Sequence, residues 1–295
     1  MLNYDAVKNW DFGSIAQTYT ERDSMLYALG LGIGADAVDA GQLQYVYEQH
    51  LRTMPTMATV LGSPGFWWRD ARTGVDWVKL VHGEQAIRVF KPLPAAATVV
   101  AQNRVTSITD KGPGRGAIVV IKREIRDQGS GELLAEVVHG TFLRGDGGYS
   151  EGSGGGPAPS DPGPPALPAP PDSAPHLEVE LATLEQQALI YRLSGDYNPL
   201  HSDPEVARAA GFTRPILHGL CTYGMAAHAV LRAVTGYDSS RIRAFAVRFT
   251  APVTPGETIK FQLWARDSSS FHLRARVHRA GESTVVLNSG IVELG

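Results

Sequence analysis

Apolar and polar residues alternate in one segment near the end of the chain. Between 271 and 277, four apolar residues are each followed by a histidine or an arginine. A period of two predicts a β-strand with one buried face. In the first half, apolar runs at 118–121 and 133–142 predict further strands. The pattern therefore predicts sheet structure in both halves of the chain.

A helical period replaces this alternation at 219–235. The apolar positions that share one stripe are Leu220, Tyr223, Ala227, Val230, Leu231 and Val234. Their spacing predicts a helix that ends at Gly236. Alanine and glycine residues flank the stripe, so apolar surface covers much of the circumference. We therefore expect a mostly buried helix followed by antiparallel strands, in an α+β fold.

Two shorter helices are predicted on either side of one irregular segment. Thr183, followed three residues later by Gln186, is typical of a capping box, and Gly195 suits the end of that helix. Asp203, directly before a proline, is typical of an N-cap, and Gly211 suits the end of the second helix. The segment between the two helices is thus held at both ends, so it can aim side chains.

A linker divides the chain. More than half of the residues at 145–175 are glycine or proline, a composition typical of a flexible or polyproline-like connection. We expect an N-terminal domain at 1–144, a linker at 145–175 and a C-terminal domain at 176–295. We also expect that the part of the linker from about 152 to 171 only tethers the two domains. With 43% hydrophobic residues the chain can fill the cores of two such domains.

The two domains resemble each other in sequence. Residues 27–32 align with 191–196, and 90–94 align more loosely with 249–255. Both halves then end in predicted strands. We therefore interpret the chain as an internal repeat.

The candidate chemistry lies in the irregular segment. Asp196, Asn198 and His201 place a carboxylate, an amide and an imidazole within a few residues, and the Asn-Pro step disfavours helix at Asn198. Each residue alone is more typical of a cap, a turn or a structural histidine. The combination of all three is not typical of such structural roles. A second motif, Pro-Ile-Leu-His-Gly, follows at 215–219.

These motifs resemble the hydratase 2 (MaoC-like) family of enoyl-CoA hydratases, whose water-activating Asp and His lie five residues apart, as Asp196 and His201 do. The resemblance implies a double hot-dog fold, in which each repeat wraps a curved antiparallel sheet around a central helix. It also implies a hydro-lyase of fatty acid metabolism and β-oxidation. That enzyme reversibly adds water, in the syn sense, to trans-2-enoyl-CoA and gives (3R)-3-hydroxyacyl-CoA. No cofactor or metal is required.

The mechanism needs an activated water, a proton for C2 and stabilisation of charge on the thioester oxygen. Asp196 and His201 can hold one water, and which of them takes the first proton stays open. Asn198 can support the loop backbone or the water. Gly219 begins the buried helix, where free N–H groups and the helix dipole favour negative charge. The resemblance likewise assigns the backbone N–H of Gly219 to the oxyanion hole.

The first repeat cannot perform this chemistry. Gly32 stands at the position of Asp196, and Ala37 stands at that of His201. The resemblance implies that this half widens the acyl pocket, so we expect a preference for medium or long acyl chains and a pocket wall near 27–32.

A second segment of the first half, at 81–85, also resembles a family segment. It contains His82 and Glu84, which we interpret as structural or pocket-lining.

Four alternatives stay open. The serious one is a (3R)-hydroxyacyl-[acyl carrier protein] dehydratase, which runs the same chemistry backwards on another carrier. A thioesterase would use Cys221 and His218. A mononuclear metal site would use Asp196, His201 and His218, although no recognised ligand motif is present. A non-catalytic acyl-CoA-binding protein predicts a degraded Asp/His pair, and the pair is intact.

The composition and the terminal segments limit the binding partners and the cellular location that we expect. The net charge of −3 gives no reason to expect nucleic-acid binding, and no apolar stretch is long enough for a membrane span. The single cysteine excludes an intrachain disulfide. The N-terminus resembles no signal peptide, and 291–295 is no peroxisomal address. We expect a cytoplasmic protein whose partner is an acyl-CoA thioester, and a homodimer stays open.

Overall fold

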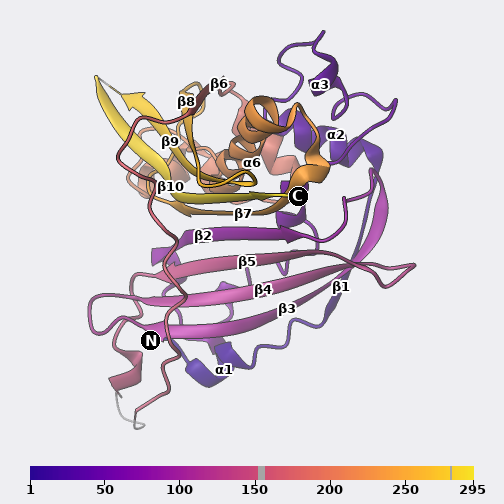
Figure 1. Cartoon of the computed structure of the whole chain (residues 1–295). Helices are drawn as coiled ribbons and strands as arrows, with labels where there is room; N and C mark the ends of the chain where they lie inside the picture. Colours follow the sequence, from indigo (N-terminus) through magenta and orange to yellow (C-terminus); the bar gives the residue numbers. More distant parts are fainter. Residues whose placement is uncertain (152–156, 280) are drawn as a thin grey trace.

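The computed structural model describes residues 1–151, 157–279 and 281–295. Ten strands form one antiparallel sheet in the order β1-β3-β4-β5-β2-β7-β10-β9-β8-β6 (Figure 1). The strands are β1 (Ser14–Tyr19), β2 (Leu80–Val89), β3 (Ala97–Asp110), β4 (Ala117–Asp127), β5 (Leu133–Leu143), β6 (Leu177–Ala182), β7 (Ile242–Phe249), β8 (Thr258–Ala265), β9 (Ser270–Arg279) and β10 (Glu282–Leu294). The strands predicted in both halves are therefore present.

The sheet order repeats across its centre. The first five strands come from one half of the chain and the last five from the other, and β2 pairs with β7 where they meet. Ala86 faces Ala246 in this pair. Beside them the guanidinium of Arg248 donates to the carboxylate of Glu84 at 2.9 and 2.6 Å. Two hot-dog sheets thus join edge to edge, which confirms the predicted double hot-dog architecture.

The helices are α1 (Tyr4–Lys8), α2 (Glu21–Gly30), α3 (Ala40–Leu43), α4 (Gln187–Tyr191), α5 (Pro204–Ala209) and α6 (Gly219–Val230). Helix α1 lies beside β3 in the first half, whereas α6 lies against the sheet in the C-terminal half (Figure 1). Helix α6 continues as a π-helix, Leu231–Thr235, and ends at Gly236 with a φ of +59°. Every residue of α6 from Cys221 onward is buried, so the predicted central helix is confirmed.

The first half differs from the expected repeat. Its segment packed against α6 is a short 3₁₀-helix, Pro55–Thr59, in which all five residues are buried. Pro55 stands at its first turn, where a proline is tolerated. In the described part of the first half, α2 is the longest helix, and a capping box between Thr20 and Asp23 begins it. The central helix is thus a feature of the second repeat alone.

The predicted start of the helix before the loop is wrong. The structure begins α4 at Gln187 without a side-chain cap. The Thr183 hydroxyl donates instead to the carbonyl of Glu257 at 2.8 Å, a contact between distant segments. The side chain of Gln187 accepts a hydrogen bond from the N–H of Leu184 at 2.8 Å, near the start of the helix. A tertiary hydrogen bond has therefore displaced the local capping box.

The second short helix follows the prediction. The Asp203 side chain accepts hydrogen bonds from the N–H groups of Glu205 and Val206, and a proline begins α5. Gly211 follows the helix with a φ of +88°. This cap is made within one turn, so the sequence was sufficient to locate it.

The linker is docked onto the first half, so the prediction that it only tethers is wrong for its described part. The Asp161 carboxylate accepts from Lys8 at 2.6 Å, from the Tyr4 hydroxyl at 3.0 Å and from the Ile108 N–H at 2.8 Å. Tyr149 is buried in the core between these elements. Residues 152–156 lie outside the described residues, and the domain boundaries at 144 and 176 stay a prediction.

No helix in the described ranges is both long and apolar enough to cross a membrane.

We predict that Asp161→Ala lowers the free energy of unfolding by about 1–3 kcal/mol at pH 7, because the buried N–H of Ile108 and the half-buried hydroxyl of Tyr4 lose their acceptor and Lys8 loses its ion pair. Burial alone would raise the pKa of Asp161, but the hydrogen bonds from Lys8, Ile108 and Tyr4 outweigh it and lower the pKa. The stabilisation is therefore present above the ordinary Asp pKa and is lost as pH falls through the lowered value.

Urea unfolding of both proteins between neutral and acidic pH measures this difference. Asp172→Ala, an exposed carboxylate of the same segment, serves as the matched control and should stay close to wild type. A loss for Asp161→Ala no larger than that of the control would show that the segment is a tether after all.

Candidate functional site

Short-range hydrogen bonds shape the loop after α4. A 3₁₀ turn, Arg192–Ser194, leads to Gly195, whose φ of +125° suits a residue without a side chain. The Asp196 carboxylate then accepts from the N–H of Asn198 at 3.1 Å. The Asn198 side chain accepts in turn from the N–H of Leu200 at 3.1 Å and caps the 3₁₀-helix Pro199–His201. Asn198 therefore holds the loop backbone, one of the two contacts expected of it.

Three side chains converge at this loop. One potential ligand atom from each of Asp196, His201 and His218 lies within 4.8 Å of the others. His201 and His218 are buried, and their rings stack with centroids 3.8 Å apart. Asp196 is half-buried. The predicted pair is thus brought together, and it is joined by His218, the residue directly before α6.

Sequence reasoning had considered His218 only for a thioesterase or a metal site. The signal that could have placed it was its position in the motif at 215–219, directly before Gly219. Its ring also lies 5.0 Å from that of the buried Tyr191. His218 is therefore fixed between α4 and the loop.

Backbone carbonyls select the tautomers of both histidines. Nδ1 of His201 lies 2.9 Å from the carbonyl oxygen of Ile216, and Nε2 of His218 lies 3.1 Å from that of Asp196. A carbonyl only accepts, so these nitrogens carry the hydrogens. Burial lowers the pKa of His201. Burial, followed by the neighbouring His201, lowers the pKa of His218 to about 4. The other nitrogen of His201 can therefore act as a base near neutral pH.

Gly219 begins α6 beside this cluster. A Cβ added there would lie 3.2 Å from the ring of Phe249, so a side chain at this position would require the ring to move by a few tenths of an ångström. The ring of Phe249 therefore fills the space into which a side chain at position 219 would point. As the first residue of the helix, Gly219 has an N–H that helical geometry leaves without an intrahelical partner, at the positive end of the dipole.

His82 and Glu84 of the first half reach the same region. The His82 ring lies 4.6 Å from Phe249 and 3.8 Å from His139 between centroids. Its Nε2 donates to the carbonyl of Glu84 at 3.1 Å, while the Glu84 carboxylate pairs with Arg248 across the junction of the two sheets. Both residues therefore have structural partners. The His82 ring packs against Phe249, whose ring also lies against Gly219.

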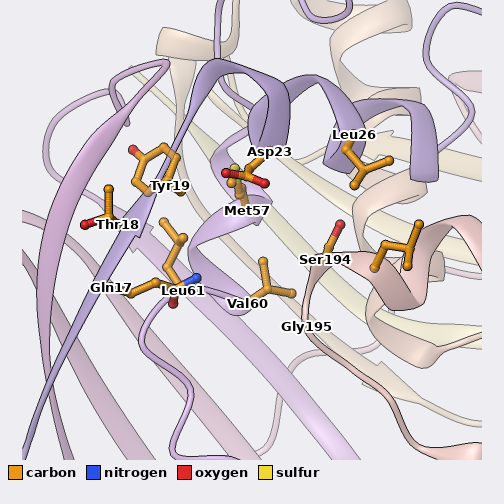
Figure 2. A pocket seen from close by; sticks show the side chains of 11 residues that line it. Gln17, Thr18, Tyr19, Asp23, Leu26, Met57, Val60, Leu61, Ser194 and Gly195 are labelled. Carbon is orange, nitrogen blue, oxygen red and sulfur yellow. The ribbon is translucent and has the colours of Figure 1, made fainter.

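A pocket of about 180 Å³ lies between the two halves next to the loop (Figure 2). Ser194 and Gly195, directly before Asp196, form one side of it. The first half supplies Leu26 from α2 together with Val60 and Leu61, which follow the short 3₁₀-helix. The pocket is therefore built by both repeats.

The predicted wall at 27–32 does not line this pocket and stays a prediction. Tyr27 and Leu31 are fully buried in the core, and the lining from the first half lies at 17–26 and 57–61. Gly30 packs directly on α4, where an added Cβ would lie 3.2 Å from the Cα of Tyr191. The segment therefore serves the contact between α2 and α4.

Arg123 supports this pocket and was missed by the sequence analysis. Its guanidinium donates to the carbonyls of Thr59 and Leu61 at 3.1 and 2.8 Å, and to the Asn103 side chain at 2.9 Å. Burial lowers its pKa to about 10. A buried charge is costly unless it is hydrogen-bonded, so these contacts fix the loop that carries Val60 and Leu61.

The cysteine is not placed for nucleophilic chemistry. Cys221 is fully buried in α6, its thiol donates to the carbonyl of Gly30 at 3.3 Å, and burial raises its pKa. A reactive cysteine needs an exposed and stabilised thiolate. The Cys221–His218 thioesterase alternative is therefore disfavoured by the geometry.

Comparisons with known proteins agree with this architecture. Residues 167–286 match the family described as MaoC like domain, and residues 17–145 match the MFE-2 hydratase 2 N-terminal domain. The chain is 41% identical to 3-hydroxyacyl-thioester dehydratase Y of Mycobacterium tuberculosis, over 93% of this chain and 92% of that protein. It is 40% identical to the peroxisomal enoyl-CoA hydratase 2 of Arabidopsis thaliana, over 84% of this chain and 82% of that protein.

Solved structures are similar over the whole length. A MaoC-like dehydratase from Phytophthora capsici superposes with a TM-score of 0.84 at 32% identity, covering 100% of this chain and 99% of that one. The double hot-dog protein Rv0216 of Mycobacterium tuberculosis superposes with a TM-score of 0.57 at 15% identity, covering 95% and 93%, which supports the fold alone. The two-repeat sheet, the buried α6 and these matches together show that the chain belongs to the MaoC-like hydratase 2 family.

Proposed function

We propose that the protein is an (R)-specific enoyl-CoA hydratase 2. It adds water reversibly, in the syn sense, to trans-2-enoyl-CoA in fatty acid metabolism and gives (3R)-3-hydroxyacyl-CoA. The observation that carries the proposal is the convergence of Asp196 and His201, with the tautomer of His201 fixed, beside the first turn of α6. The relatives named enoyl-CoA hydratase 2 and 3-hydroxyacyl-thioester dehydratase support it.

In this mechanism one water lies between Asp196 and His201. Its oxygen bonds to C3 of the substrate as one of these side chains takes its proton. The protonated Asp196–His201 pair then gives a proton to C2, which returns the pair to its starting state. The negative charge that develops on the thioester oxygen is stabilised by the N–H of Gly219. His218 donates to the carbonyl of Asp196 and so positions the loop.

Acyl carrier protein is the alternative carrier. One relative is named only for a hydroxyacyl thioester, and the same residues would catalyse dehydration of a carrier-bound substrate. Comparing kcat/KM for crotonyl-CoA with that for crotonyl-acyl carrier protein separates the two functions.

Three further expectations belong to this proposal. The first half forms the acyl pocket and the second half carries the chemistry, the protein acts in the cytoplasm, and a homodimer stays open. Several relatives are named as peroxisomal, so imaging of a fluorescent fusion in the source cell tests the location. Light scattering in solution tests the oligomeric state.

We predict that Asp196→Asn and His201→Ala each lower kcat/KM for crotonyl-CoA by about two to four orders of magnitude, the size typical of losing a positioned acid or base. Steady-state hydration assays on purified variants measure the loss, and circular dichroism checks the fold. His278→Ala, an exposed histidine on β9, is the control and should keep wild-type activity. Near-normal activity of a folded variant would remove that residue from the mechanism.

The stereochemistry of the product gives a second prediction. Because the catalytic pair belongs to a hydratase 2 site, hydration of crotonyl-CoA should give the 3R isomer. Chiral chromatography of the hydrolysed product distinguishes the isomers. An excess of the 3S product would contradict the assignment even if the enzyme is active.

The pocket predicts chain-length selectivity. Leu26→Trp should block part of the pocket and so hinder the longer acyl tail of trans-2-octenoyl-CoA more than the short tail of crotonyl-CoA. Losing the burial of about two methylenes, each worth about 0.8 kcal/mol, would lower kcat/KM for the longer substrate roughly tenfold more. The matched control is Leu29→Trp, an exposed position on the same helix that does not line the pocket. Equal losses for both substrates in Leu26→Trp would show that the acyl tail lies elsewhere.

A further inference from the structure

A β-bulge turns His82 toward the interior of the molecule. Buried side chains stand at every second position of β2 from 85 to 89, and this alternation alone would place His82 on the opposite, outer face. The register with β5 shifts between His82 and Glu84, so Gly83 is one extra residue in the strand. A bulge reverses the alternation and re-aims a side chain. His82 therefore lies opposite Thr141, whose side chain is fully buried.

On this inner face, His82 lies between two other rings. Its ring centroid is 3.8 Å from that of His139 on β5 and 4.6 Å from that of Phe249, the last residue of β7. The Phe249 ring in turn lies 3.2 Å from the point where a Cβ of residue 219 would stand. A line of rings therefore connects the sheet of the first half to Gly219, the first residue of α6 in the second half.

The His82 ring is neutral and held in orientation. Burial lowers its pKa to about 4, although its hydrogen bond to the Glu84 carbonyl and the negative charge of Asp196 act in the opposite direction. Its Nε2 donates to that carbonyl at 3.1 Å. The ring is therefore uncharged near neutral pH. What it offers to the neighbouring site is its packing against Phe249 rather than a charge.

The start of α6 depends on such packing. His218, the residue before the helix, makes no side-chain cap hydrogen bond, so the first turn is not fixed by the usual N-cap contact. The ring of Phe249 lies against this turn. A donor of an oxyanion hole has to lie within about 2.7–3.1 Å of the oxygen that becomes charged. A small displacement of Gly219 would therefore move its N–H out of this range.

We propose that His82 is a positioning residue for the hydration step. Acting through Phe249, it holds the N–H of Gly219 at the place where the thioester oxygen develops negative charge. The first half has no counterpart of Asp196 or His201, and it thus contributes to the reaction through packing. This inference rests on the proposed function and deepens it, because it gives the first repeat a role in the same chemical step.

Steady-state hydration of crotonyl-CoA by the purified full chain tests the proposal. His82→Ala should lower kcat roughly tenfold to a hundredfold, less than the loss of an oxyanion-hole donor itself. KM should change by less than about threefold, since the lost interaction acts in the transition state. His82→Phe keeps a flat ring and should retain most of the wild-type kcat. Arg88→Ala, an exposed position of the same strand, is the matched control and should behave as wild type does.

A spectrum separates positioning from a general loss of structure. Bound 2,4-hexadienoyl-CoA absorbs at longer wavelength when a hydrogen-bond donor polarises its thioester carbonyl. We expect a red shift in the wild type, a smaller one in folded His82→Ala and a restored one in His82→Phe. Circular dichroism checks the fold of each variant.

A second variant keeps the test open should His82→Ala not fold. Phe249→Leu breaks the same line of rings and should lower both kcat and the red shift. Where both single variants fold, the double variant should lose little more than either of them, because the two side chains act through one contact.

The outcomes separate this inference from the proposed function. A wild-type kcat and red shift in His82→Ala would overturn the positioning role, and so would a loss confined to KM. A loss in His82→Phe as large as in His82→Ala would also overturn it, since a polar atom of the imidazole would then be needed rather than its packing. Absence of hydration by the wild-type protein overturns the proposed function instead, and the red shift of the bound dienoyl-CoA then still tests His82.

Discussion

The antiparallel pairing of β2 with β7 is the constraint on which the rest of the structure depends. It converts two five-stranded sheets into one ten-stranded sheet. Its backbone hydrogen bonds fix the two halves relative to each other, and the Glu84–Arg248 ion pair adds a charged contact beside them. Because the pocket takes walls from both halves and the loop lies beside it, a shift at this junction would separate the pocket from the chemistry.

The two repeats have diverged in what their interiors hold. The second keeps a long buried helix whose first turn meets the loop with Asp196 and His201. The first has a short 3₁₀-helix at the corresponding face, and the residues after it line the pocket. Arg123 holds that segment through its carbonyl groups. A buried cation therefore holds the segment of the first repeat that faces α6.

The sequence was sufficient to predict those features that depend only on residues within one helical turn. The Asp203 cap and the end of α6 at Gly236 depend on neighbours in the sequence, so both were predicted. The Thr183 capping box failed because the hydroxyl finds the carbonyl of Glu257, which lies 74 residues away. The pairing of Asp196 with His201 followed from the resemblance to hydratase 2, whose Asp and His have the same spacing. The place of His218 and the pocket wall required contacts between segments that no periodicity reveals.

The docked linker has a consequence for how the halves find each other. Asp161 binds Lys8, which lies 153 residues away, and so holds the connection against the first half before it crosses to β6. Two hot-dog halves on a free tether could exchange partners between chains, which is the usual route to domain-swapped dimers. A connection fixed along its path shortens the reach of the second half. It therefore favours closure of the sheet within one chain over exchange between neighbours.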